Sequence, residues 1–206
     1  MNKLSYKTIV SESEATVKEK GSSFIAMAFP VNSLAAFESL YGKIKKQYHD
    51  ASHHCYALKL ADDFEKFSDN GEPSGTAGVR IMNVLNHYDL YDTAIIVTRY
   101  FGGTKLGVGP LGVAYSEAAM SCLSHAQIIE KHSFTPLTIT TSFEFTNPVY
   151  RLFADYSVKI ESTKFEPDVV YSVLLPTASK ENFLKAFEEN LRGKGKITVS
   201  ERPVYK

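Results

Sequence analysis

The 206-residue sequence has few cysteines, no excess of charge of either sign and no long apolar run. Its 23 Lys and Arg residues balance 23 Asp and Glu residues, which excludes a strongly basic nucleic-acid-binding chain but not a local basic patch. No apolar stretch approaches the roughly 18 residues of a membrane-spanning helix. The polar N-terminus lacks the features of a signal or transit peptide. We therefore expect a cytoplasmic protein.

Only two cysteines are present, Cys55 and Cys122, and neither belongs to a CxxC or other metal-binding spacing. This scarcity excludes a disulfide-based scaffold and favours a reducing compartment. With 44% hydrophobic and 12% aromatic residues, the chain can bury a core, so a disordered protein is excluded as well. We expect no metal and no cofactor.

The first part of the chain shows strands followed by alternating helices and strands. Asn32–Ser33 is predicted to cap a first helix, whose apolar residues recur every three or four positions. Thr76 is predicted to cap a second helix, and a third covers 110–127. Because TAIIV (93–97) is apolar throughout, this strand is expected to be covered on both faces. The other predicted strands are 5–10, 14–18, 22–31 and 55–60, with a polar loop at 61–75. The order indicates an α/β-type first domain.

Residues 132–136 are predicted to form a linker to a second domain. Beyond it we predict strand 137–146, helix 148–156, strands 158–165 and 169–176 around a turn at 166–168, a helix from the Ser179 cap to Gly193, and strand 196–201. The order β-α-β-β-α-β is the ferredoxin-like split βαβ pattern. The predicted domains are therefore 1–132 and 133–206.

A glycine-rich loop after strand 93–97 is the first candidate site. No acidic residue lies between Thr93 and Ser116, whereas Arg99 and Lys105 supply two positive charges. Free amides at the start of helix 110–127 would complete an anion site, and an aromatic pair beside basic residues is typical of single-strand binders. The alternative is a glycine-rich connection that packs closely against the helix. The candidate residues are Arg99, Tyr100, Phe101, Gly102, Gly103, Thr104, Lys105, Gly107 and Gly109.

Two nucleotide-binding motifs are excluded in this loop. Residues 107–112 spell GxGxxG, but a dinucleotide fingerprint directly follows the first strand of a βαβ unit, and here a loop intervenes. The phosphate loop GxxxxGK[ST] fails because Val108 follows Gly107.

The second candidate site is DNGEPSGTAG (69–78) with the histidines before it. Its two carboxylates could serve acid/base chemistry or bind a cation, and the alternative is a turn followed by an extended rim. His53 and His54 point to opposite faces of a strand, so they do not chelate one metal together. His53 shares a face with Cys55, as in a nucleophilic pair, the alternative being a buried cysteine beside a hydrogen-bonded histidine. The candidates here are His53, His54, Asp69, Glu72, Ser74 and Thr76.

The motifs DNGEPSGTAG, GVRIMNVL, IIVTRYFGGTKLG and VGPLGVAYS together resemble the signature of the IMPACT/YigZ family in its two-domain bacterial form. The resemblance implies an α+β chain. Its N-terminal domain would be like the second domain of a small-subunit ribosomal protein, and its ferredoxin-like C-terminal domain similar to the last domain of elongation factor G. Eukaryotic relatives of the first domain regulate translation by competing for the activator of a stress-responsive initiation-factor kinase.

From this resemblance we expect a non-enzymatic regulator linked to translation, which binds RNA, the ribosome or a translation-associated protein. One alternative is a peptidase-like hydrolase that uses His53, Cys55, Asp69 or Glu72. Another is a binder of a small anion or phosphate at the helix start near Pro110. The chain departs from the family pattern where Pro110 replaces a glycine and Val113 replaces a basic residue. The second change weakens phosphate binding inferred from the family.

Overall fold

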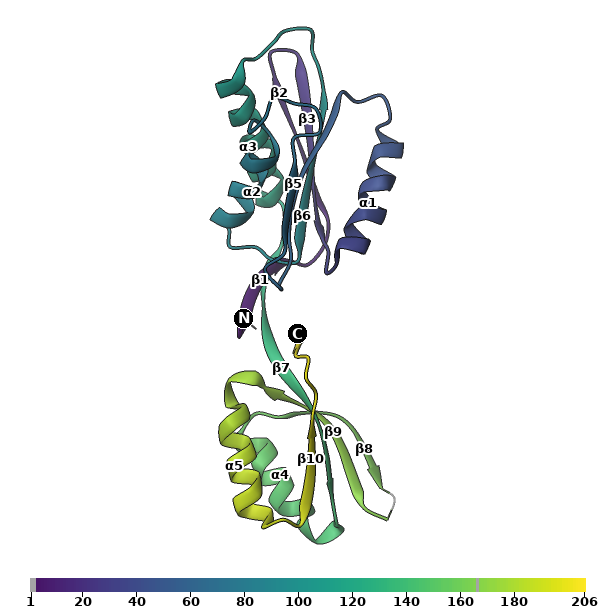
Figure 1. Ribbon diagram of the computed structural model, residues 1–206, viewed down its shortest axis with the longest axis vertical. Helices are drawn as coiled ribbons and strands as arrows, with labels where there is room; N and C mark the ends of the chain where they lie inside the picture. The colour runs from purple at the N-terminus through teal and green to yellow at the C-terminus, as the bar shows by residue number, and fades with distance from the viewer. Residues whose placement is uncertain (1–2, 166) are drawn as a thin grey trace. The chain divides into compact units, whose positions relative to one another are not determined.

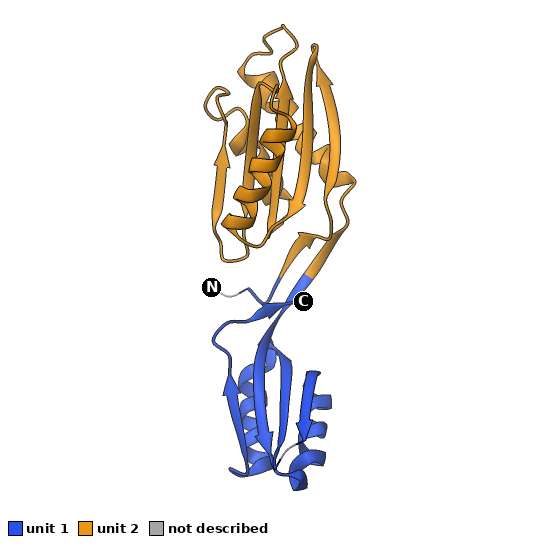
Figure 2. Cartoon of the chain, turned by 90° about the vertical axis from the view of Figure 1, so that its right-hand side faces the viewer, with its two compact units in different colours: residues 1–5, 131–206 blue, residues 6–130 orange. Residues whose placement is uncertain are grey.

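The computed structural model describes residues 3–165 and 167–206, which divide into two compact units (Figure 1). One unit is Tyr6–Glu130, and the other is Lys131–Lys206 with the described residues up to Ser5 (Figure 2). The sequence placed all of 1–132 in one domain, whereas this division puts Lys3–Ser5 with the C-terminal residues.

The unit Tyr6–Glu130 is built on an antiparallel five-stranded sheet with the strand order β2-β3-β6-β4-β5. The strands are β2 (Ser13–Glu19), β3 (Ser22–Pro30), β4 (His53–Lys59), β5 (Glu65–Ser68) and β6 (Thr93–Tyr100). Helices α2 (Gly78–His87) and α3 (Val108–Ser124) cover one face, and α1 (Leu34–Gln47) covers the other (Figure 1). Strand β5 lies in the segment that was predicted to be a loop. The α/β-type domain that the element order indicated is wrong, because such a domain has a mostly parallel sheet and every strand pairing here is antiparallel.

The central strand β6 is covered on both faces, as its continuous apolar run predicted. Ile95 and Val97 belong to the hydrophobic cluster under α2 and α3, whereas Ala94 and Ile96 belong to the cluster under α1. All four side chains are fully buried. The predicted cap of α1 is also confirmed, because the Ser33 hydroxyl accepts a hydrogen bond from the Ala36 amide at 3.2 Å.

The C-terminal unit follows the predicted β-α-β-β-α-β order. Its elements are β7 (Ile128–Thr141), η1 (Phe143–Phe145), α4 (Thr146–Asp155), β8 (Lys159–Phe165), β9 (Val169–Pro176), η2 (Thr177–Ser179), α5 (Lys180–Leu191), β10 (Gly195–Val199) and β11 (Val204–Tyr205). The sheet has the order β1-β7-β9-β8, where β1 is Ser5–Ile9, and β10 and β11 also pair with β7. Val149, Leu152, Phe183 and Phe187 from α4 and α5 pack with sheet residues in one hydrophobic cluster.

The predicted linker at 132–136 is wrong, because these residues lie inside β7. Phe134 pairs with Pro176 of β9 and with Val204 of β11, and its side chain is buried. The strand ends at Thr141 instead of residue 146, since Phe143–Phe145 turns the chain into α4. Residue 166 of the predicted turn lies outside the described residues. Among the described residues, no helix combines the length and apolar character that crossing a bilayer requires.

Candidate functional site

The two candidate loops meet at Glu72, which is the centre of a buried polar cluster. Its Oε1 accepts hydrogen bonds from Arg99 Nη1 at 2.6 Å and from the Tyr115 hydroxyl at 2.7 Å. Its Oε2 lies 3.7 Å from His53 Nε2. The Cys55 Sγ lies 3.3 Å from the Tyr115 oxygen. We call these five residues the Glu72 cluster.

The sheet register brings the cluster together. His53 and Arg99 are partners across β4 and β6, and Cys55 lies two residues further on the same face of β4. Tyr115 reaches the cluster from the apolar stripe of α3 and is fully buried. A buried tyrosine hydroxyl needs a hydrogen-bond partner. The candidate residues from the sequence did not include Tyr115, although its hydroxyl within the apolar stripe of α3 was a signal for this role.

Arg99 was expected to face an external anion, and the structure contradicts this. The residue is 5% exposed, and its guanidinium forms the ion pair with Glu72. It also donates to the Ser22 hydroxyl at 3.3 Å and lies 5.5 Å from the centre of the Phe101 ring. A buried charge requires such a partner, because leaving it unpaired after desolvation costs several kcal/mol. Arg99 therefore holds β6 to the 69–78 loop.

The chemistry of Cys55 is that of a protonated thiol. Burial raises its pKa to about 12, and burial also raises the pKa of Tyr115. The thiol donates to the Asp69 carbonyl at 3.0 Å. A nucleophilic cysteine needs a lowered pKa, so this geometry does not support a His53–Cys55 nucleophilic pair. Within residues 3–165 and 167–206, no three His, Cys, Asp or Glu side chains are grouped to hold a metal ion.

The two adjacent histidines lie on opposite faces, as predicted. His53 Nδ1 donates to the Asn70 carbonyl at 2.9 Å, which leaves Nε2 on the side of Glu72. His54 is buried on the other face, with Nδ1 3.1 Å from the Thr98 hydroxyl. Burial lowers the pKa of His54, with further contributions from Lys45 and His53. His54 thus takes no part in the Glu72 cluster.

The cap of α2 is Asp69, and the predicted cap by Thr76 is wrong. Asp69 accepts hydrogen bonds from the amides of Gly75, Ala77 and Gly78 at 2.8–2.9 Å, while Thr76 donates to the Pro73 carbonyl at 2.6 Å. The helix begins only at Gly78, and one carboxylate can satisfy several amides. Burial acts to raise the pKa of Asp69, but the amides of Gly75, Gly78 and Ala77 outweigh it and lower the pKa. Ser74 lies exposed on the rim.

The glycine-rich loop is anchored at its start and exposed beyond it. The Tyr100 hydroxyl donates to the Asp50 carboxylate at 2.7 Å. A Cβ at Gly102 would lie 1.9 Å from the main-chain carbonyl carbon of Gly21, so this glycine permits close packing against the β2–β3 turn. This agrees with the close-packing alternative for the first half of the loop.

The second half of the loop leaves several groups accessible to solvent. Phe101 is 48% exposed. Helix α3 starts at Val108, two residues earlier than predicted, and no side chain caps it. The other exposed members of the candidate set are Gly102, Gly103, Thr104, Lys105, Gly107 and Gly109. An anion could contact these groups, whereas Arg99 and Tyr100 belong to the scaffold.

A hollow of about 480 Å³ lies beside the start of α3. Its lining consists of Glu19, Gly109, Pro110, Val113, Ala114 and Glu117. The two carboxylates repel phosphate, so this side of the helix start is unsuited to an anion.

The fold and the site define a two-unit α+β protein with a closed polar cluster and one exposed glycine-rich loop. The sequence model of the Impact N-terminal domain matches residues 20–123, about half of the chain, and the chain belongs to the IMPACT family. It is 29% identical to the IMPACT family member YvyE of Bacillus subtilis, over 96% of this chain and 92% of the relative. It is 28% identical to YigZ of Escherichia coli, over 94% of this chain and 98% of the relative.

The two-unit arrangement of elements also occurs in a solved structure. A crystal structure of a hypothetical protein aligns with a TM-score of 0.68 at 25% identity, covering 97% of this chain and all of that one. The likeness therefore extends through both units and beyond the matched Impact domain.

Proposed function

We propose that this protein is a non-enzymatic, translation-linked regulator that binds RNA through the exposed half of the glycine-rich loop. Membership of the IMPACT family supports the proposal. We also propose that the first unit is similar to the second domain of a small-subunit ribosomal protein. The second unit would likewise be similar to the last domain of elongation factor G.

The observation that carries the proposal is the exposed ring of Phe101 above a buried cation. Its ring centre is 5.5 Å from the Arg99 guanidinium, and almost half of its surface is open to solvent. A base can stack on such a ring, and stacking of this kind tolerates any base. The Arg99 guanidinium keeps the ring in place because its own position is fixed by Glu72.

The phosphate backbone would then lie near Thr104 and Lys105. Lys105 supplies a positive charge, and the uncapped amides at the start of α3 add donors. The carboxylates of Glu19 and Glu117 disfavour a phosphate on the side of the α3 start where the hollow lies. The expected contact is therefore short, with one stacked base and one or two phosphates.

Binding of a labelled oligouridine, followed by fluorescence anisotropy at low and high salt, tests this function. Phe101→Ala is expected to weaken binding about tenfold through loss of stacking. Lys105→Ala is expected to weaken binding less than Phe101→Ala does. It should also reduce the slope of log affinity against log salt concentration by about one, which corresponds to one released counterion. Lys185→Ala is the matched control, because Lys185 is exposed on α5 in the other unit.

Sedimentation with ribosomes at the same salt concentrations extends the test to structured RNA. Absence of salt-dependent binding to both oligouridine and ribosomes would contradict the proposal. A thermal shift on addition of free nucleotides, without binding of oligouridine or ribosomes, would instead favour the small-anion alternative at the same loop.

A further inference from the structure

Strand β2 forms one edge of the five-stranded sheet. It pairs with β3, and no other described strand pairs with its outer side. Alternate residues Ala15 and Val17 pack against the cluster under α2 and α3, so Glu14, Thr16 and Lys18 point to the opposite face and are exposed. An open edge strand is a template for a further strand, because its outward amides and carbonyls have no strand partner.

The charges along this edge are symmetric about Thr16. In an antiparallel pair of β2 strands with Thr16 opposite Thr16, Glu14 of each copy lies directly opposite Lys18 of the other. Glu12 and Lys20 flank the strand at equal distances on either side and carry the same complementary charges. Neither Glu14 nor Lys18 forms an ion pair with any residue that the structure describes. Opposite charges that face each other across two strands stabilise the pairing.

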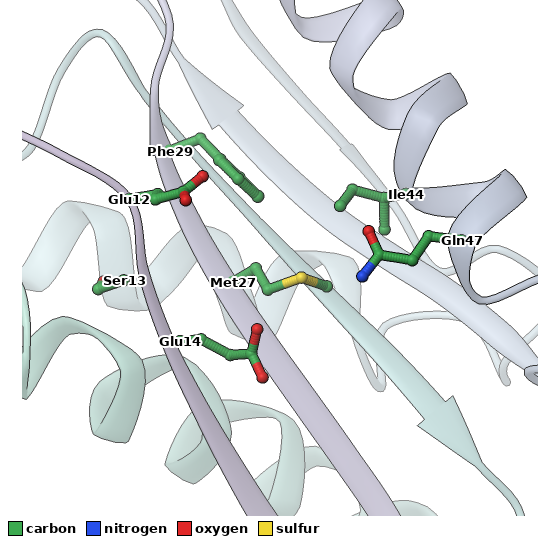
Figure 3. A pocket seen from close by; sticks show the side chains of 7 residues that line it. All are labelled: Glu12, Ser13, Glu14, Met27, Phe29, Ile44 and Gln47. Atoms are coloured by element: carbon green, nitrogen blue, oxygen red, sulfur yellow. The ribbon is translucent and has the colours of Figure 1, made fainter.

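A groove lies beside this strand, and it suits the lysine side chain that such pairing would place next to it. It has a volume of about 340 Å³ on the side of α1, and its lining consists of Glu12, Ser13, Glu14, Met27, Phe29, Ile44 and Gln47. Figure 3 shows the two glutamates on one side, Ile44 and Gln47 of α1 on the other, and Met27 and Phe29 between them.

The groove therefore combines an apolar floor with carboxylates at its rim. A lysine has an aliphatic stem and a charged end, which match this combination. Glu14 is paired with Met27 in the β2–β3 register, so a lysine opposite Glu14 would lie close to the groove. Lys18 of a second copy occupies that position.

We propose that the protein forms a twofold-symmetric dimer by antiparallel pairing of β2 with β2 of a second copy. The pairing joins the two five-stranded sheets edge to edge. Lys18 of each copy lies against Glu14 of the other and extends into the other's groove. The interface is isologous, so one ion pair implies its symmetry mate.

Charge reversal tests the proposal through the mass in solution, measured by light scattering after gel filtration. The natural chain is expected to have twice the monomer mass at low salt. Lys18→Glu and Glu14→Lys each turn two attractive pairs into repulsive ones, so each weakens dimerisation by about tenfold or more. The combined variant Glu14→Lys/Lys18→Glu restores complementarity and the dimer. Lys185→Glu, the same charge change on an exposed residue of α5, leaves the dimer intact.

Cysteine cross-linking tests the register separately. In the proposed register, Thr16→Cys places the two new thiols of the dimer directly opposite each other, close enough for a disulfide. In Glu14→Cys, each new thiol lies opposite Lys18 of the other copy, four residues from the other thiol, which is too far for a disulfide. Both native cysteines are buried and do not compete. Mild oxidation is expected to cross-link Thr16→Cys and not Glu14→Cys.

The proposal is overturned if the natural chain stays monomeric at low salt. It is also overturned if the combined variant remains monomeric while circular dichroism shows the same folded spectrum as the natural chain. Equal cross-linking of Thr16→Cys and Glu14→Cys would overturn the register.

Discussion

The buried carboxylate of Glu72 is surrounded by cationic and hydroxyl donors, of which Arg99 is the counter-ion. Glu72→Gln leaves the 5%-exposed Arg99 without its counter-ion. We expect the free energy of unfolding to fall by about 3–5 kcal/mol. Tyr115→Phe removes one hydroxyl from the same carboxylate and is expected to cost about 1–2 kcal/mol. Urea unfolding measures both, and a larger cost for Tyr115→Phe would contradict this account of the cluster.

The raised pKa of Cys55 predicts a loss of stability at alkaline pH. Its ordinary pKa of 9.0 applies in the unfolded chain, whereas burial raises the pKa to about 12 in the fold. The fold therefore prefers the protonated thiol, and stability present below pH 9 falls as the pH rises toward 12. Urea midpoints across this range test the prediction. Cys55→Ala should be less stable at neutral pH but lose less stability with rising pH, and identical slopes would contradict the assignment.

The candidate residues show what a sequence pattern can and cannot predict about a site. Glu72, His53 and Cys55 were singled out by residue type, and they do lie together. The ion pair between Glu72 and Arg99 was not predicted, because it depends on the register of β4 with β6 and on the path of a loop from another part of the chain. Tyr115 was missed because an aromatic residue on a helix stripe is usually a core residue.

At the scale of elements, the two glycines at 102 and 109 differ in what surrounds them. A Cβ at Gly102 would meet the Gly21 and Ser22 main chain at 1.9–2.3 Å, whereas a Cβ at Gly109 would meet nothing within 4 Å. We expect Gly102→Ala to destabilise the protein by about 2 kcal/mol or more through overpacking. Gly109→Ala lies in the first turn of α3 and should change stability by less than about 1 kcal/mol. Thermal unfolding compares the two, and equal effects would contradict the packing argument.

The start of α2 shows why the cap was assigned to the wrong residue. Thr76 stands close before an apolar helical pattern, which favours it by sequence alone. Asp69 lies nine residues before Gly78, and the intervening loop folds back so that its carboxylate meets three amides. A cap supplied from such a distance depends on the loop conformation, which no local pattern predicts.

At the scale of the whole molecule, the hydrophobic clusters belong to separate units. Two clusters lie on the two faces of the N-terminal sheet, and one lies in the C-terminal unit. Phe183→Ala, in the C-terminal cluster, is expected to cost about 3–5 kcal/mol. Hydrogen exchange should show lost protection within 131–206 and unchanged protection of the N-terminal sheet. A uniform loss along the chain would contradict separate cores.

Secondary structure was predictable where one periodicity dominates. The stripe of α1, the apolar run of β6 and the alternation of β9 each follow from local spacing. Strand β5 and the first half of β7 were not predicted. The residues of β5 are mostly polar and none is buried. Strand β7 continues through Pro136 because β9, β10 and β11 all pair along it.

The sequence alone determined the two-part organisation, the β-α-β-β-α-β order of the second part, the family and the loops in which functional residues had to be sought. These follow from periodicities, caps and motifs that act over a few residues. Only the tertiary structure decided that Arg99 is an internal counter-ion and that Cys55 is a buried thiol. It also decided that Phe101 remains exposed above the cluster. The reason is physical: burial and pairing depend on which distant strands become neighbours, and desolvation then fixes the charge state of each group.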